Sequence, residues 1–124
     1  VRGGYFGVFV FSLGLDLKNF KIFLGNANFS ELKSARGLDN LQIIDGYANF
    51  RSLKSAEGLK KLQIIGGPAN FNNLKSAEAL NSLQEIGWTA HFESLQSVEG
   101  LEKCNRYDDI KEDVEGRKAE EKIK

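Results

Sequence analysis

The chain has 124 residues, a length that fits one domain with a single viable hydrophobic core. Its 17 basic side chains balance its 17 acidic ones, so no net field would recruit nucleic acid or an anionic membrane. The single cysteine excludes an internal disulfide and leans against a disulfide-stapled secreted class, without indicating a cellular compartment. We therefore expect one domain, with no nucleic-acid or membrane partner.

Residues 1–24 include the most apolar part of the chain. Apolar residues occupy every second position from Phe9 to Leu17, which is the period of a β-strand. A signal peptide is the alternative, with Arg2 ahead of the hydrophobic run, but no small-x-small cleavage pattern follows. The run is also too short to cross a bilayer as a helix. We predict that residues 1–24 form a degenerate first coil that caps an array of repeats.

The rest of the chain repeats with a period of 21 residues. One copy, GYANFRSLKSAEGLKKLQIIG, spans Gly46–Gly66. Similar copies span Gly25–Asp45 and Gly67–Gly87, and a diverged fourth copy spans Trp88–Asp108. A constant period without insertions is the signature of a solenoid, in which each coil buries its neighbour. The pattern predicts one solenoid over residues 25–104.

The spacing within one copy indicates the shape of the coil. Six apolar residues stand three apart: Phe50, Leu53, Ala56, Leu59, Leu62 and Ile65. Steps of three slip by about 60° on an α-helix, so this spacing excludes one long amphipathic helix. It favours a polygonal coil in which every third residue points inward. A short alternating segment in each copy predicts a strand. We expect these strands at 27–29, 48–50, 69–71 and 90–92, paired in parallel and in register.

The repeat resembles a leucine-rich repeat, especially that of receptor L domains. LKSAEGL at Leu53–Leu59 is similar to the turn of those repeats, and LQIIGG at Leu62–Gly67 is similar to their closing segment. The strand here carries Ala and Phe where the family usually has two aliphatic residues, and the family's disulfides are missing. The resemblance covers residues 25 to about 104. With the patterns above, it implies a right-handed, β-rich α/β solenoid of about five repeats with one parallel sheet.

Polar residues recur in rows as regular as the apolar ones. The charged rows are Lys33, Lys54 and Lys75, and Glu57, Glu78 and Glu99. Like charges stacked on successive coils repel one another, so we expect these rows to be solvated on the outside of the coil. A serine row comprises Ser34, Ser55, Ser76 and Ser97. We expect these hydroxyls to bond backbone N–H groups in a tight corner, because a catalytic serine would be unique and paired with a base.

A further row, Asn28, Asn49, Asn70 and His91, points outward from the predicted sheet by alternation. One interpretation is an asparagine ladder, in which the amides bond one another or the turn backbone. The other is a polar binding face, the usual place for ligands on an open solenoid. The candidate binding residues are Tyr47, Asn49, Arg51, Asn70, Asn72 and His91. They combine amide groups, one aromatic ring and one guanidinium, a mixture found where few residues carry most binding energy.

The end of the chain departs from the repeat. Cys104 replaces a leucine of the earlier copies and is interpreted as a small buried hydrophobe rather than a nucleophile. One His and one Cys do not make a metal-ligand set, and we expect no metal or cofactor. Residues 105–124 are rich in Glu and Lys, and their charges run as the dipole of a helix favours. They predict a helical cap in which Tyr107, Ile110 and Val114 share one face. A disordered tail is the alternative.

Two function classes remain open from these patterns. The first is a non-catalytic module that binds a protein or peptide across the exposed face of its sheet. The second is a structural segment of a longer repeat protein that associates end to end with copies of itself. An enzyme is not expected, because the sequence offers no phosphate-binding loop, no nucleophile–base pair and no metal set.

Overall fold

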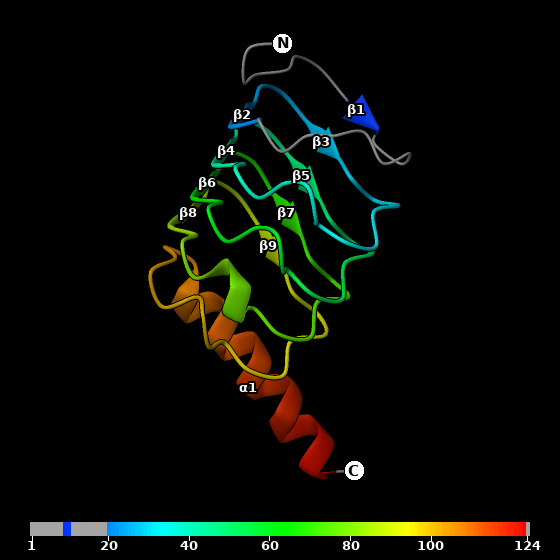
Figure 1. The fold of residues 1–124 in the computed structure, drawn as a ribbon. Coiled ribbons are helices and arrows are strands. Elements are labelled where there is room, and N and C mark those ends of the chain that lie inside the picture. Colours follow the sequence, from blue (N-terminus) through cyan, green and yellow to red (C-terminus); the bar gives the residue numbers. More distant parts are fainter. Residues whose placement is uncertain (1–8, 11–19, 124) are drawn as a thin grey trace.

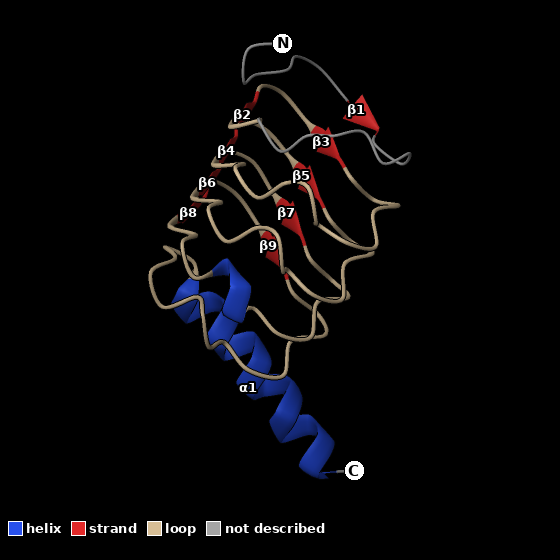
Figure 2. Cartoon of the chain, in the orientation of Figure 1, coloured by secondary structure: helices blue, strands red, loops and turns tan. Residues whose placement is uncertain are grey.

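A computed structural model describes residues 9–10 and 20–123 of the chain. The described chain winds into a β-solenoid and ends in one long helix, as Figures 1 and 2 show. The strands in chain order are β1 (Phe9–Val10), β2 (Ile22–Phe23), β3 (Ala27–Asn28), β4 (Ile43–Ile44), β5 (Ala48–Asn49), β6 (Ile64–Ile65), β7 (Ala69–Asn70), β8 (Glu85–Ile86) and β9 (Ala90–His91). A short 3₁₀ helix, η1, spans Glu78–Leu80, and the terminal helix α1 spans Tyr107–Ile123.

The first sheet has the order β1-β3-β5-β7-β9, and every neighbouring pair is parallel. From β3 onward the register advances by one repeat per strand, so that Ala27 pairs with Ala48 and Ala48 with Ala69. The predicted parallel strands in the four copies are therefore confirmed. β1 lies beside β3, whereas the rest of the predicted capping coil, residues 1–8 and 11–19, lies outside the described residues.

The described residues form two parallel sheets, so the expectation of one sheet was wrong. The second sheet has the order β2-β4-β6-β8, and Figure 1 shows it along another side of the coil. From β2 to β8 the chain completes about three turns, fewer than the roughly five repeats expected. The second sheet has no alternating signature, because its strands consist of two residues and both residues are apolar in β2, β4 and β6. In β6, Ile65 is buried while Ile64 is only partly covered.

The core is a set of rows that run along the solenoid. Phe29, Phe50, Phe71 and Phe92 stack in line, with ring centroids 5.1, 5.3 and 5.1 Å apart and interplanar angles of 12–17°. The three inner rings are fully buried, and Phe92 is 4% exposed. Leu38, Leu59, Leu80 and Leu101 form a second buried row. Both predicted core rows are confirmed.

Tight turns produce the spacing of three. Within one coil, the N–H groups of Leu53, Leu59 and Leu62 donate to the carbonyls three residues earlier, at 3.1, 2.9 and 3.0 Å. The serine row supports these corners as expected. Ser34, Ser55, Ser76 and Ser97 each accept a hydrogen bond at Oγ from the backbone N–H two residues on, at 3.1–3.3 Å. The repeated sequence and its local hydrogen bonds thus place the same tight turns and corners in each coil.

The corner after the serine depends on glycine. Gly58 has φ = +105°, and a Cβ there would clash with the carbonyl oxygen of Ala35 on the preceding coil. Residues with a Cβ rarely adopt this conformation. The next copy carries Ala79 at this position, and there the corner becomes the 3₁₀ helix η1. The chain therefore accommodates the extra methyl group by changing the type of turn.

The helix α1 covers the last coil. Ile110 and Val114 are buried at 2% and 3% exposure, and Tyr107 is partly buried beside them, as the apolar spacing predicts. Arg117 reaches back and donates from Nη2 to the carbonyl oxygens of Phe92 and Leu95, at 2.9 and 3.2 Å. The helix continues through Gly116 to Ile123.

Candidate functional site

The candidate face is built from the outward side chains of the first sheet. Asn28, Asn49 and Asn70 lie in β3, β5 and β7 and follow one another in register, and His91 in β9 continues the row. Each asparagine is partly covered, whereas His91 is exposed. Parallel strands place equivalent residues about 4.8 Å apart. The fold therefore brings the four side chains into one straight line across the coils.

The side-chain oxygens of this row are used by the fold. Oδ1 of Asn28 accepts from the N–H of Ser30, Oδ1 of Asn49 from that of Arg51, and Oδ1 of Asn70 from that of Asn72. The three distances are 3.1, 3.1 and 3.0 Å. These are bonds from each side chain to the turn that follows its own strand, a common role for asparagine. They correspond to the turn-backbone form of the ladder interpretation, not to amide-to-amide stacking.

The side-chain nitrogens of the same row remain open. Within the described part of the chain, Nδ2 of Asn28, Asn49 and Asn70 makes no hydrogen bond. Each Oδ1 makes the same bond to the turn that follows its strand, so the three amides occupy equivalent positions in their coils. An NH₂ group carries two donor hydrogens. The row therefore presents a repeated set of donors to the outside.

Tyr47, Arg51 and Asn72 flank the row in the same coils. The backbone N–H of Tyr47 donates to Oδ1 of Asn26 on the preceding coil, at 2.9 Å. Its equivalent in the next coil is Pro68, which has no N–H to satisfy. Arg51 is exposed. Oδ1 of Asn72 is buried and has no hydrogen-bond partner among the described residues.

His91 stands apart from the other candidates because it borders the terminal helix. A hollow of about 290 Å³ lies between β9 and α1 and is lined by Thr89, Ala90, His91, Arg106, Asp109, Ile110 and Asp113. Asp109 forms an ion pair with Arg106 at 3.6 Å. The fold thus brings Asn49, Asn70 and His91 into one row, with Tyr47, Arg51 and Asn72 beside it, and places His91 at the row's end.

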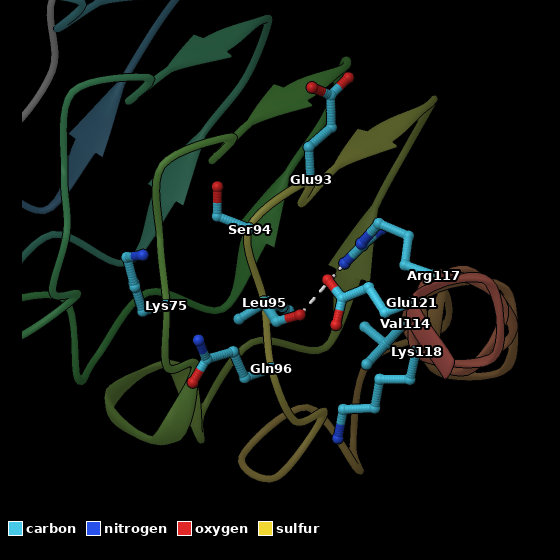
Figure 3. A pocket seen from close by; sticks show the side chains of 9 residues that line it. All are labelled: Lys75, Glu93, Ser94, Leu95, Gln96, Val114, Arg117, Lys118 and Glu121. Atoms are coloured by element: carbon cyan, nitrogen blue, oxygen red, sulfur yellow. Dashed lines mark hydrogen bonds between the residues drawn. The ribbon is translucent and has the colours of Figure 1, made fainter. Parts of the chain in front are cut away.

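A larger hollow of about 600 Å³ lies on a different part of the surface, between the last coil and the second half of α1. Figure 3 shows Lys118 and Glu121 reaching into it from the helix, with Ser94 and Gln96 on the coil opposite. Arg117 crosses from the helix to the coil, and its bond to the Leu95 carbonyl is drawn there. The lining mixes both charge signs, so the hollow favours neither an anion nor a cation.

Sequence reasoning missed one exposed residue near the candidate face. Trp88 is 67% exposed and opens the last coil, where the earlier copies have Gly25, Gly46 and Gly67. The signal was present, since a glycine replaced by tryptophan at a repeat position is unusual. The Trp88 ring is open to solvent with α1 in place.

The described residues offer little support for a reactive thiol, a metal site or a membrane-spanning helix. Burial raises the pKa of the Cys104 thiol, against a smaller opposing effect of Arg106, and the side chain is 5% exposed. The thiol is therefore protonated and covered at neutral pH, in keeping with its predicted place in a leucine row. Among the described residues, no three His, Cys, Asp or Glu side chains gather closely enough to hold a metal ion. None of the described helices has the length and apolar character to cross a membrane.

Comparisons with protein-family models, with curated proteins and with solved structures found no match to this chain. The description of the site therefore rests on its own geometry.

Proposed function

We propose that this protein is a non-catalytic binding module that recognises a protein or peptide across the outer face of its first sheet. The observation that carries the proposal is the difference in bonding between the two ends of each asparagine amide. Oδ1 holds the turn, at 3.1 Å from the Arg51 nitrogen in the case of Asn49, while Nδ2 has no hydrogen-bond partner in the described chain. Pre-oriented donors lower the entropy cost of binding.

The flanking residues add the groups that dominate the energy of many interfaces. Tyr47 supplies an aromatic ring and Arg51 an exposed guanidinium, one on each side of Asn49 in the chain. Tyrosine and arginine are enriched among residues whose truncation costs the most binding energy. The Lys and Glu rows are the other possible binding surface. Their charges are hydrated and screened by water, so each contact that they make contributes little binding energy.

We also propose that the coil is of the leucine-rich-repeat type and right-handed. The 21-residue period, the LxSAEGL corner and the serine bonds within it support this assignment. The parallel arrangement of the strands is compatible with it, and the second sheet gives these coils an additional ladder.

The alternative is a structural segment that stacks end to end on copies of itself. The geometry at the last coil gives this alternative less support. Asn105 bonds both backbone groups of Ile86, and α1 packs Ile110 and Val114 on the last coil. A second copy would have to displace both before it could pair with β8. Light scattering over a range of concentrations separates the two, because a stacking segment grows in mass and a binding module stays monomeric.

The proposal is tested by selecting peptides from a displayed random library on the purified protein and measuring their affinity for two double variants. In Tyr47→Ser/Arg51→Ser the candidate face loses its ring and its charge, while the backbone N–H of Arg51 still bonds Asn49. In Lys54→Ser/Glu57→Ser the solvated rows are changed instead. We expect the first variant to lose binding and the second to keep it. Binding that survives in the first and disappears in the second would assign the partner to the other face.

A further inference from the structure

The asparagine row favours a partner rich in hydrogen-bond acceptors. Each Oδ1 of Asn28, Asn49 and Asn70 already accepts one hydrogen bond from its turn, so the Nδ2 donors are the groups of the row that have no partner among the described residues. The neighbouring row contributes one cation, Arg51, and one anion, Glu93, both exposed. The face therefore has no field that would favour a charged ligand over a neutral one. Its complement is a surface with many neutral acceptors and few donors.

Among polypeptide conformations, polyproline II fits this requirement best. An α-helix uses its carbonyls internally, and an extended strand brings as many N–H groups as carbonyls to a row whose unpartnered groups are donors. A proline-rich segment in polyproline II has no N–H on its prolines and leaves its carbonyls solvated. Such a segment also loses little conformational entropy when it binds.

The spacing of the coils agrees with the same conformation. Polyproline II rises about 3.1 Å per residue with three residues per turn, so it repeats after about 9.3 Å. Two coils of the solenoid span about 9.6 Å, because parallel strands lie about 4.8 Å apart. Asn28 and Asn70 are two coils apart. They can therefore meet carbonyls one turn apart on the same ridge of the ligand. A β-strand repeats each side after about 6.7 Å and does not match.

Aromatic residues lie where the chain enters this sheet in two coils that are two repeats apart, at adjacent rather than equivalent positions of the repeat. Tyr47 stands just before β5, and Trp88 stands just before β9 with 67% of its surface exposed. Pro68 occupies the coil between them. Proline-rich segments dock on surfaces that present aromatic rings together with hydrogen-bond donors. We propose that the partner is a proline-rich segment in polyproline II, running along the solenoid axis over the asparagine row and the two rings. This inference rests on the function proposed above.

The test uses the full chain and the peptide acetyl-(Pro)₁₂-amide as the probe. Trp88 is the only tryptophan, so its fluorescence reports binding without a label. Asn70→Asp keeps an Oδ atom for the Asn72 N–H but replaces the unpartnered donor with an acceptor. Asn73→Asp is the matched control, since it makes the same charge change at an exposed asparagine outside the row. Peptides (Gly-Ser)₆ and (Glu-Gly)₆ of equal length report flexible and anionic ligands.

We expect a saturable change in Trp88 fluorescence with acetyl-(Pro)₁₂-amide and none with (Gly-Ser)₆. Asn70→Asp should weaken the affinity about tenfold, the usual effect of one lost hydrogen bond that leaves a carbonyl unpaired. Asn73→Asp should leave it unchanged. The inference is overturned if millimolar proline peptide gives no saturable change, if (Glu-Gly)₆ binds more tightly, or if Asn70→Asp and Asn73→Asp behave alike. A peptide from the library selection that binds through Tyr47 and Arg51 while the proline peptide fails would overturn the inference and leave the proposed function intact. Failure of both would remove both.

Discussion

The side chain of Asn105 takes the place of a strand against Ile86. Its Oδ1 accepts from the Ile86 N–H at 2.9 Å, and its Nδ2 donates to the Ile86 carbonyl at 3.3 Å. The backbone N–H of Asn105 also donates to the Gln84 carbonyl at 2.9 Å, as the next coil would. β8 is the last strand of the second sheet, and an unpaired edge is a site for aggregation. One amide thus closes the ladder where the repeats end.

We predict that Asn105→Ala lowers the free energy of unfolding by about 1–3 kcal/mol, because the Ile86 N–H loses its partner and the Ile86 carbonyl keeps only the bond from Arg106 Nε. The measurement is urea unfolding, and Asn73→Ala serves as the control, since its side chain is exposed and away from the sheet edge. The variant should also associate at high concentration through the open edge of β8. Equal unfolding curves for the two variants would show that Asn105 does not close the sheet.

The phenylalanine row predicts a large effect of truncation in the middle of the stack. Phe50 is fully buried between Phe29 and Phe71, with ring centroids at 5.1 and 5.3 Å. Phe50→Ala removes this packing and leaves a cavity, so we expect a loss of about 3–5 kcal/mol of stability. Thermal and urea unfolding measure it, with Tyr47→Ala in the same coil as the partly exposed control. A parent-like unfolding curve for Phe50→Ala would contradict the packing described.

The glycine corner with positive φ predicts that replacement by alanine lowers the stability of the protein by different amounts at Gly58 and at its equivalent Gly37. Gly58→Ala meets the Ala35 carbonyl of the preceding coil, whereas a Cβ at Gly37 has no atom of the described residues within 4 Å. Both carry the strain of φ near +100°, about 1–2 kcal/mol for a residue with a Cβ. We therefore expect Gly58→Ala to destabilise the protein more than Gly37→Ala in thermal unfolding. Equal melting temperatures would mean that the corner at Gly58 converts to a 3₁₀ turn, as at Ala79, without cost.

Burial of Cys104 predicts a dependence of stability on alkaline pH. The pKa of this thiol is raised in the folded state by desolvation, so the unfolded chain loses the proton first as the pH rises. The folded state therefore binds more protons above about pH 9, and stability that is fully present below this pH is lost above it. Cys104→Leu restores the residue found at Leu41, Leu62 and Leu83 and removes the titrating group. The parent should lose more stability than this variant between neutral pH and about pH 10.5. Parallel pH profiles would contradict the assignment.

The features of this fold that could be predicted are those that follow from the 21-residue period of the sequence. Phe50 and Leu59 could be placed in the core because a 21-residue repeat puts each above its counterpart in the next coil. The second sheet could not be predicted, because Ile64 and Ile65 are both apolar and only the coil's geometry decides which one points inward. Asn105 belongs to the segment 105–124 that the sequence predicts as a helical cap, and its bond to Ile86 depends on how the last coil closes.

The sequence predicted which residues of the candidate site share one row, but not which atom of each asparagine is bonded to the turn. Alternation placed Asn49 and Asn70 on the outward face with His91, and the register of the sheet confirms that they are neighbours. The use of Oδ1 by the turn could not be derived, since the two ends of an amide occupy the same position in any sequence pattern. Trp88 was classed as a sign of the repeat's end, and its exposure depends on the corner between the two sheets.

The central claim is that the outward amide nitrogens, not the turn oxygens, meet the partner. It is tested most directly by recording the side-chain NH₂ signals of asparagine in a ¹⁵N-labelled protein while a selected peptide is added. We predict that the Nδ2 signals of Asn28, Asn49 and Asn70 shift together and saturate at one affinity, while the backbone N–H signals of Ser30, Arg51 and Asn72, held by Oδ1, move much less. Shifts confined to the hollow between the last coil and α1, around Gln96 and Lys118, would contradict the claim and place the binding site there.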